Sequence, residues 1–220
     1  MFRLKRVTPL FALLLMTVLS GVHADDKKEI KLFNENDLSG WGHFLTKPVK
    51  REEVWSVKNG ILICKGTPGG YLATKKKYTN FKLVVEWRWP KKPGNSGVLM
   101  RITGKPTMLP NCVEAQLQHQ NAGDMYGFQG FKIDGDKSRK SANPNVLGGL
   151  TSVKKIMRNE KKPGEWNKYE ITANGGKITV MLNGKKVNEA TGCDVRAGQI
   201  GLQSEGGEIH FRTVKLTPIK

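Results

Sequence analysis

Two residues with acid–base and hydrogen-bonding chemistry, Glu114 and Gln116, lie in the run from Cys112 to Gln118. Apolar and polar residues alternate in this run, and alternate side chains of a β-strand point to opposite faces of a sheet. The two side chains are therefore predicted to share one polar face. A carboxylate there suits a general base or a metal ligand, and a planar carboxamide suits hydrogen bonding to sugar hydroxyls.

The same alternation adds further planar polar side chains to this predicted face. In the run Phe81 to Trp89 the apolar residues sort to one side, which leaves Glu86 and Arg88 on the other. A guanidinium beside Glu114 would lower the pKa of its carboxyl group and keep it ionised. An ordinary solvated sheet face is the alternative. The predicted polar face comprises Glu86, Arg88, Arg101, Glu114, Gln116, Gln118, Gln203, His210 and Arg212.

Three more candidate site residues follow the predicted strand. His119 stands just past its end, where a structural role is the alternative. Asp124 and Tyr126 lie in the stretch 120–165, which has little strand pattern, and so long an irregular stretch is usually functional or mobile. We expect this stretch to form one side of a binding cleft, where Tyr126 either stacks on a sugar ring or holds the loop. We also expect one short helix within Asn145–Arg158.

Several other kinds of site are excluded. The run Asp134 to Ser138 resembles a calcium loop, but Arg139 occupies the sixth position and Asn145 the twelfth, where an EF-hand needs Gly and Glu. No nucleophile elbow, phosphate-binding loop or dinucleotide-binding motif occurs where a predicted strand leads into a helix. The three cysteines, Cys64, Cys112 and Cys193, do not have the spacing of metal ligands. They could form one disulfide and leave one free thiol, but the sequence does not determine which two would pair.

The elements that must position these residues are short β-strands. Hairpins are predicted at Asn59-Gly60, Asn174-Gly175-Gly176 and Asn183-Gly184, because these residues tolerate positive φ. About eleven strands predict an all-β, two-sheet antiparallel β-sandwich with long loops. The predicted strands are Lys31–Phe33, Val54–Val57, Ile61–Cys64, Gly70–Thr74, Phe81–Trp89, Gly97–Ile102, Cys112–Gln118, Lys168–Ala173, Lys177–Leu182, Gln199–Gln203 and Glu208–Leu216.

The composition is that of a folded, strongly basic protein. The 220 residues include 37 Lys plus Arg and 19 Asp plus Glu, a formal charge of +18, and 38% are hydrophobic, which argues against disorder. Lysines gather in loops, as at 75–77 and 154–155, and we expect most of them to be solubilising. Binding of an acidic polysaccharide is the alternative.

The amino-terminal stretch has the pattern of a secretory signal. Arg3, Lys5 and Arg6 precede the apolar run Leu10–Leu19, and small residues follow it up to Ala24. The run is too short to span a bilayer. We expect a signal peptide at 1–24, one domain at 25–220, export to the periplasm or the extracellular space, and hence neither a nucleic-acid partner nor a membrane span.

An ordered set of short motifs covers nearly the whole of the predicted domain. In order and spacing the set resembles the 3-keto-disaccharide hydrolase family. The resemblance implies a concanavalin A-like jelly roll that binds carbohydrate. The motifs are Leu32-Phe33-Asn34, Leu38-Ser39-Gly40-Trp41, Trp55-Ser56-Val57, Asn59-Gly60-Ile61-Leu62, Tyr71-Leu72, Tyr78 to Phe81, Glu86-Trp87-Arg88, Asn95-Ser96-Gly97-Val98, Arg101, Glu114, Gln116, Gly164-Glu165-Trp166-Asn167, Leu182-Asn183-Gly184, Gly198 to Gln203 and Phe211-Arg212.

The resemblance also implies a reaction on glycosides already oxidised at C3. A base removes the C2 proton, the C1 substituent leaves by β-elimination, and water then adds. Glu114 is expected to be the base or the ligand of an assisting divalent metal ion, with His119 and Asp124 as secondary catalytic candidates. The residues expected to orient the sugar are Glu86, Arg88, Arg101 and Gln116, with Arg88 or Arg101 stabilising charge on the C3 oxygen.

Two other functions stay open at this point. A non-catalytic carbohydrate-binding module would share the fold, because fold and site are separable. A polyanion-binding or envelope-associated protein would use the lysine-rich loops. The sugar, the linkage, the metal and the oligomeric state are not fixed by the sequence.

Overall fold

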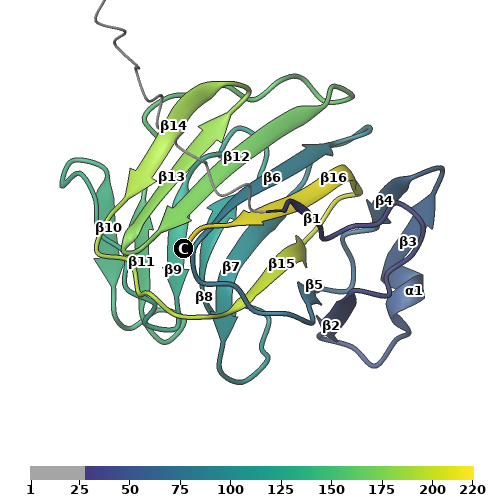
Figure 1. The fold of residues 1–220 in the computed structure, drawn as a ribbon, viewed down its shortest axis with the longest axis horizontal. Helices are drawn as coiled ribbons and strands as arrows, with labels where there is room; N and C mark the ends of the chain where they lie inside the picture. Colours follow the sequence, from purple (N-terminus) through teal and green to yellow (C-terminus); the bar gives the residue numbers. More distant parts are fainter. Residues whose placement is uncertain (1–27) are drawn as a thin grey trace, which may run out of the picture.

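The computed structural model describes residues 28–220, which form two stacked antiparallel β-sheets (Figure 1). One short helix, α1 (Arg51–Val54), is the only helix in this part of the chain. The predicted all-β, two-sheet sandwich is thus confirmed. None of the described residues forms a helix long and apolar enough to cross a membrane. The predicted signal peptide at 1–24 lies outside the described residues.

The strands divide into two sheets of eight. Sheet A has the order β14-β13-β12-β6-β16-β4-β3, with β1 pairing to β16, and sheet B has the order β10-β11-β9-β8-β7-β15-β5-β2. Sheet A contains β1 (Ile30–Lys31), β3 (Trp55–Lys58), β4 (Ile61–Cys64), β6 (Phe81–Arg88), β12 (Asn167–Asn174), β13 (Lys177–Leu182), β14 (Lys185–Ala190) and β16 (Ile209–Pro218). Sheet B contains β2 (Trp41–Leu45), β5 (Gly70–Thr74), β7 (Gly97–Thr103), β8 (Asn111–Gln116), β9 (Met125–Phe128), β10 (Lys140–Asn143), β11 (Leu150–Val153) and β15 (Gln199–Ser204).

The three predicted hairpins are confirmed. Asn59 and Gly60 join β3 to β4 with φ of 52° and 72°, and Asn183 and Gly184 join β13 to β14 with φ of 50° and 80°. Positive φ at both central residues gives a turn whose twist matches that of the flanking strands. The third hairpin joins β12 to β13.

The core lies between the sheets and follows the predicted alternation. On β6, Leu83, Val85 and Trp87 are fully buried, while the residues between them face away from the core. From sheet B, Val113 and Ala115 on β8 enter the same apolar cluster. This alternation fixes which side chains of each strand are left for the outer faces.

The stretch 120–165 differs from the prediction. It contains β9, β10 and β11, which extend sheet B beyond β8. The helix predicted within Asn145–Arg158 is wrong, because Leu150–Val153 forms strand β11 between β9 and β10. Two further strands, β2 and β14, also lack a prediction. Pairing with neighbouring strands, rather than local pattern, determines these short segments.

Arg101 is a structural residue and not part of an open polar face. It lies at an irregularity of the β7–β8 pairing, with φ of 55° and no exposed surface. Its guanidinium donates hydrogen bonds to the backbone carbonyls of Thr79 (3.0 Å), Asp194 (2.6 Å) and Gly175 (2.9 Å). The expected sugar-binding role of Arg101 is therefore wrong, because its donors are used within the fold.

The three cysteines are free thiols, and all three are buried. Burial raises the pKa of Cys64 and of Cys193 to about 11, so both stay protonated at neutral pH. The possible disulfide is thus not formed.

Replacing Arg101 is expected to destabilise the sandwich. Arg101→Ala leaves three buried carbonyls without their charged donor, which is expected to cost about 3 kcal/mol of unfolding free energy. Arg101→Lys is expected to recover little, since one ammonium cannot reproduce the planar fork. Urea denaturation measures both, with the exposed Lys185→Ala on β14 as control. A loss for Arg101→Ala no larger than that of the control would contradict the assignment.

Candidate functional site

Glu114 lies at the centre of the outer face of sheet B, the side turned away from the core. It is on β8, opposite Tyr126 on β9 and opposite Leu99 on β7. Its neighbours on β8, Val113 and Ala115, point into the core. The predicted alternation of β8 is therefore confirmed, and it places Glu114 beside the side chains of both neighbouring strands.

The Glu114 carboxyl group is buried over Gly97. A Cβ atom at Gly97 would lie 1.8 Å from Glu114 Oε1, so only glycine leaves room for this position. The side chain is 1% exposed, and Oε1 makes no hydrogen bond. Burial, and secondly the charge of Glu205, raises the pKa of Glu114 well above its ordinary value. A buried carboxyl group without a partner favours its protonated form.

The pKa of Glu114 is raised, whereas the sequence analysis expects a neighbouring arginine to lower it. No guanidinium makes a hydrogen bond or an ion pair with Glu114 in the described part of the chain. Arg101 is turned to backbone carbonyls, and Arg88 lies on the other sheet. The hypothesis that an arginine holds Glu114 ionised is therefore wrong.

Two glutamines flank Gly97 on the neighbouring strands. Gln203 on β15 is fully buried, and both atoms of its carboxamide lack hydrogen-bond partners. Gln116 on β8 is paired with Gly97, and its Oε1 accepts hydrogen bonds from the backbone amides of Leu117 and Gln118 at 2.8 Å each. The predicted place of both glutamines on the same face as Glu114 is confirmed, and Gln203 keeps both its donor and its acceptor unused.

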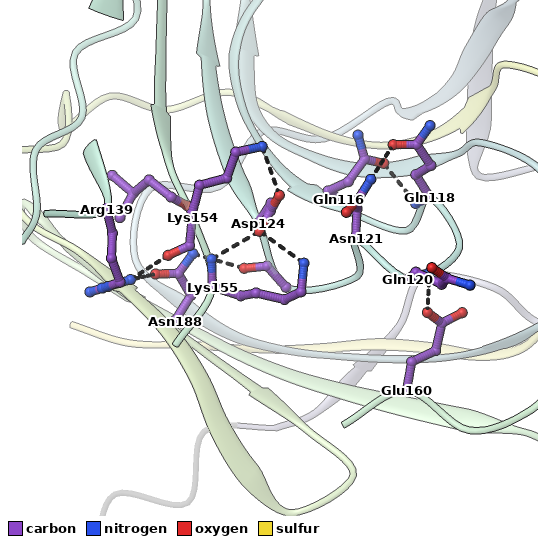
Figure 2. Close-up of polar contacts among 12 residues, drawn as sticks. Gln116, Gln118, Gln120, Asn121, Asp124, Arg139, Lys154, Lys155, Glu160 and Asn188 are labelled. Carbon is purple, nitrogen blue, oxygen red and sulfur yellow. Dashed lines mark hydrogen bonds and ion pairs between the residues drawn. The ribbon is translucent and has the colours of Figure 1, made fainter. Parts of the chain in front are cut away.

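A lysine–tyrosine–aspartate cluster adjoins Glu114 through Tyr126, its cross-strand neighbour. Figure 2 shows the contacts of its lysines with Asp124. Lys154 Nζ donates to Tyr126 Oη at 2.8 Å and to Asp124 Oδ2 at 3.0 Å. Lys155 binds Asp124 Oδ1 through its backbone amide at 2.9 Å and through Nζ at 3.3 Å. Both oxygens of Asp124 are thus occupied, so Asp124 orients the two lysines and is not a free base.

Tyr126 carries the hydroxyl group of this cluster. Its ring stacks on Phe128 with 6.0 Å between centroids, and Glu114 is its cross-strand neighbour. Burial raises the pKa of Tyr126, whereas the hydrogen bond from Lys154 opposes that effect. The hydroxyl oxygen accepts a hydrogen bond from Lys154, and its own proton is directed to Asp124 Oδ2 over a long contact of 3.5 Å.

Lys154 is a candidate functional residue that the sequence did not reveal. The prediction groups it with the solubilising loop lysines. In the structure it continues the alternation of β11, in which Ser152 also lies on the outer face, opposite Tyr126. Recognising Leu150–Val153 as a strand would have placed Lys154 on the same face as Tyr126.

His119 lies beyond the end of β8, apart from the outer face on which Glu114 is found. Its ring Nδ1 is 3.0 Å from Glu160 Oε1, and both residues line a pocket of about 250 Å³ at the β8–β9 connection. The structure therefore does not bring His119 and Glu114 into one acid–base pair.

Glu86 and Arg88 lie on the outer face of sheet A, across the sandwich from Glu114. Both are on β6, where Glu86 binds Arg212 of β16 through two hydrogen bonds of 2.9 and 3.1 Å. Arg88 packs 4.6 Å from the ring centroid of Trp166. The single predicted polar face is therefore wrong, since its members occupy two faces separated by about 10 Å of core or more.

An apolar cluster shares the outer face of sheet B with Glu114. Leu99, Tyr71 and Phe128 are buried there, and Phe44 stacks on Tyr71 with 5.6 Å between ring centroids. Aromatic rings with a few polar groups beside them are typical of small-molecule binding sites. With Glu114 1% exposed, almost the whole of its side chain is covered by these neighbours.

The described residues do not supply a metal centre. Within 28–220 no three His, Cys, Asp or Glu side chains converge to hold an ion. Of the carboxyl groups near Glu114, Asp124 is already bound by two lysines. The expected divalent metal ion therefore has no ligand set among these side chains.

Comparison with known proteins identifies the family and agrees with the fold. Residues 28–217 match the family described as the 3-keto-alpha-glucoside-1,2-lyase-like domain. A 3-keto-disaccharide hydrolase from Bacteroides thetaiotaomicron is 23% identical over 237 residues, covering 85% of this chain and 77% of that protein.

Two solved structures share the β-sandwich. The crystal structure of a candidate glycosyl hydrolase from Parabacteroides distasonis is 27% identical, with a TM-score of 0.62 over 87% of this chain and 100% of the other. The carbohydrate-binding module CBM66 from Bacillus subtilis is 13% identical, with a TM-score of 0.58 over 80% of this chain and 94% of the module, which shows the fold alone. With a family match over almost the whole described chain, the protein belongs to the 3-keto-alpha-glucoside-1,2-lyase-like domain family and is a carbohydrate-active, hydrolase-like β-sandwich protein.

Proposed function

We propose that the protein cleaves the glycosidic bond of 3-keto-glycosides by removing the C2 proton and eliminating the C1 substituent. The observation that carries the proposal is the buried, unpartnered carboxyl group of Glu114 at the centre of the outer face of sheet B. Family membership supports the substrate class.

Glu114 is the proposed base. The C3 carbonyl acidifies the C2 hydrogen, and the ionised carboxylate accepts that proton while the C–H electron pair forms an enolate at the C3 oxygen. The enolate then returns its electrons, a C1–C2 double bond forms, and the C1 oxygen leaves with its bonding pair. The leaving oxygen takes up the proton held by Glu114, which restores the carboxylate. Water adds across the double bond and completes net hydrolysis. Burial makes the ionised carboxylate a stronger base, because it raises the pKa of the group.

Tyr126 and Lys154 are the proposed donors to the negative charge that develops on the substrate. Tyr126 is the cross-strand neighbour of Glu114, Lys154 contacts the Tyr126 hydroxyl, and Asp124 holds the ammonium in position. Fixed donors aimed at developing charge are worth several kcal/mol in a water-poor site. Gln203, with its unused carboxamide, is the proposed contact to sugar hydroxyls.

The proposed place of action is outside the cytoplasm. The pattern of residues 1–24 supports export, with the domain beginning near residue 25. Radiolabelled or tagged precursor, followed for loss of this segment on secretion, tests the assignment.

A second candidate function is carbohydrate binding without turnover. The aromatic rings of Tyr71 and Phe44 on the outer face of sheet B support it, because a binding module needs apolar contacts but no catalytic base. The fold does not decide between the two candidates, since enzymes and binding modules share it.

Glu114→Gln is expected to lower turnover of a 3-keto-disaccharide by at least about 100-fold, because an amide cannot accept the C2 proton. Release of the sugar is followed by mass spectrometry. Protein freed of metal with a chelator and protein supplemented with divalent ions are assayed in parallel. Glu170→Gln, the same chemical change on the outer face of sheet A, is the matched control and should retain wild-type turnover. Unchanged turnover for Glu114→Gln would remove its assignment as base, and binding without turnover by the wild type would favour the second candidate.

Lys154→Gln is expected to reduce kcat about tenfold or more with little change in Tm, since it removes one proposed donor. The hydrogen bond from Lys154 lowers the pKa of Tyr126, so the variant should also ionise Tyr126 at higher pH, which ultraviolet titration of tyrosinate detects. Lys185→Gln, an exposed lysine on β14, is the control. An unaltered tyrosine titration together with wild-type kcat would contradict the proposed pairing.

A further inference from the structure

The pocket at the β8–β9 connection combines a fixed histidine with three cationic side chains. It has a volume of about 250 Å³, and its lining includes His119, Arg158, Lys161 and Lys162. His119 follows β8, and the other three belong to the segment between β11 and β12. Two stretches far apart in the sequence thus build one concave, positively charged site.

The positive charge of this pocket is only partly compensated, because three cationic side chains share it with one carboxylate, that of Glu160. Arg158, Lys161 and Lys162 are exposed, and none of them forms an ion pair with another described residue. Other lysines of the chain are paired, such as Lys168 with Glu170 and Lys186 with Glu189. Three neighbouring cations without acidic partners create a positive potential that favours an anion.

The only acidic side chain of the pocket is used to hold its wall. Glu160, with a side chain 8% exposed, accepts a hydrogen bond from the backbone amide of Gln120 at 2.7 Å (Figure 2). Its other oxygen lies 3.0 Å from His119 Nδ1. Because a carboxylate only accepts hydrogen bonds, Nδ1 carries the proton, and Nε2 makes no hydrogen bond within the described residues.

The same contact fixes an uncommon backbone conformation. Gln120 has φ of 68°, in the left-handed region that few residues other than glycine adopt. The hydrogen bond to Glu160 holds this residue, and with it the turn that presents His119. The wall of the pocket is therefore built in advance and does not depend on a bound ligand.

We propose that this pocket binds an anionic substituent, a carboxylate or a sulfate ester, carried by a glycan. The anion assignment stands on the excess of cationic side chains over carboxylates and on the fixed histidine, whereas the glycan part rests on the proposed function. Arg158 would bind the oxyanion through its planar fork, and the two lysines would act as point charges. The pocket is distinct from the outer face that carries Glu114.

The test compares two triple variants that lose the same charge. One removes the pocket cations, as Arg158→Gln, Lys161→Gln and Lys162→Gln, and the control removes a lysine-rich loop elsewhere, as Lys75→Gln, Lys76→Gln and Lys77→Gln. Calorimetry measures binding of a sulfated oligosaccharide, a uronate oligosaccharide and a neutral oligosaccharide at fixed ionic strength. Sodium sulfate alone is titrated against the His119 ring signals by NMR.

The pocket variant is expected to lose at least tenfold in affinity for one or both anionic oligosaccharides, and the control less than twofold. The sulfated and uronate arms then identify which anion is preferred. Equal losses in the two variants would overturn the proposal, because they would indicate diffuse attraction to a basic surface. So would wild-type protein that binds no anionic oligosaccharide. Turnover of a neutral 3-keto-disaccharide reports separately on the proposed function and is expected to be unchanged in the pocket variant.

Discussion

The burial of the Glu114 carboxyl group over Gly97 is the contact on which the site depends. A buried polar group without a hydrogen bond costs about 1–3 kcal/mol, so the fold must supply that stability elsewhere. It does so through the core between the sheets, where Leu83 and Val85 of β6 and Val113 and Ala115 of β8 belong to one apolar cluster. Gly97 is equally required, because any Cβ at that position would occupy the space of the carboxyl oxygen.

The arrangement around Glu114 follows from strand order. Because β8 lies between β9 and β7, and β15 follows β7, one row of the sheet brings Tyr126, Glu114 and Leu99 together. Ser152 of β11 continues this row, and Lys154, two residues further along, reaches the Tyr126 hydroxyl only because β11 is added beyond β9. The donors and the proposed base therefore come from segments up to forty residues apart, held by backbone pairing and not by loops.

Local rules predicted the strands and their inward faces but could not assign strands to sheets. Alternation sorts Glu86 and Glu114 in the same way, yet β6 and β8 belong to different sheets, and only long-range pairing distinguishes them. The hairpins were predictable since Asn-Gly carries its own conformational preference. Lys154 and Glu160 were not, because the strand and the turn that orient them exist only after tertiary pairing.

The pH dependence of stability tests the central claim, that the folded protein keeps Glu114 protonated above the ordinary pKa of 4.5. Between that value and the raised pKa the folded state binds more protons than the unfolded state, so the unfolding free energy falls as pH rises, by up to about 1.4 kcal/mol per pH unit. The Glu114→Gln variant lacks this pH-dependent contribution to the unfolding free energy, because its amide does not titrate. Urea unfolding of both proteins from pH 4 upwards should therefore show the variant gaining stability relative to the wild type as pH increases. A difference that stays constant, or that changes in the opposite direction, would contradict the account.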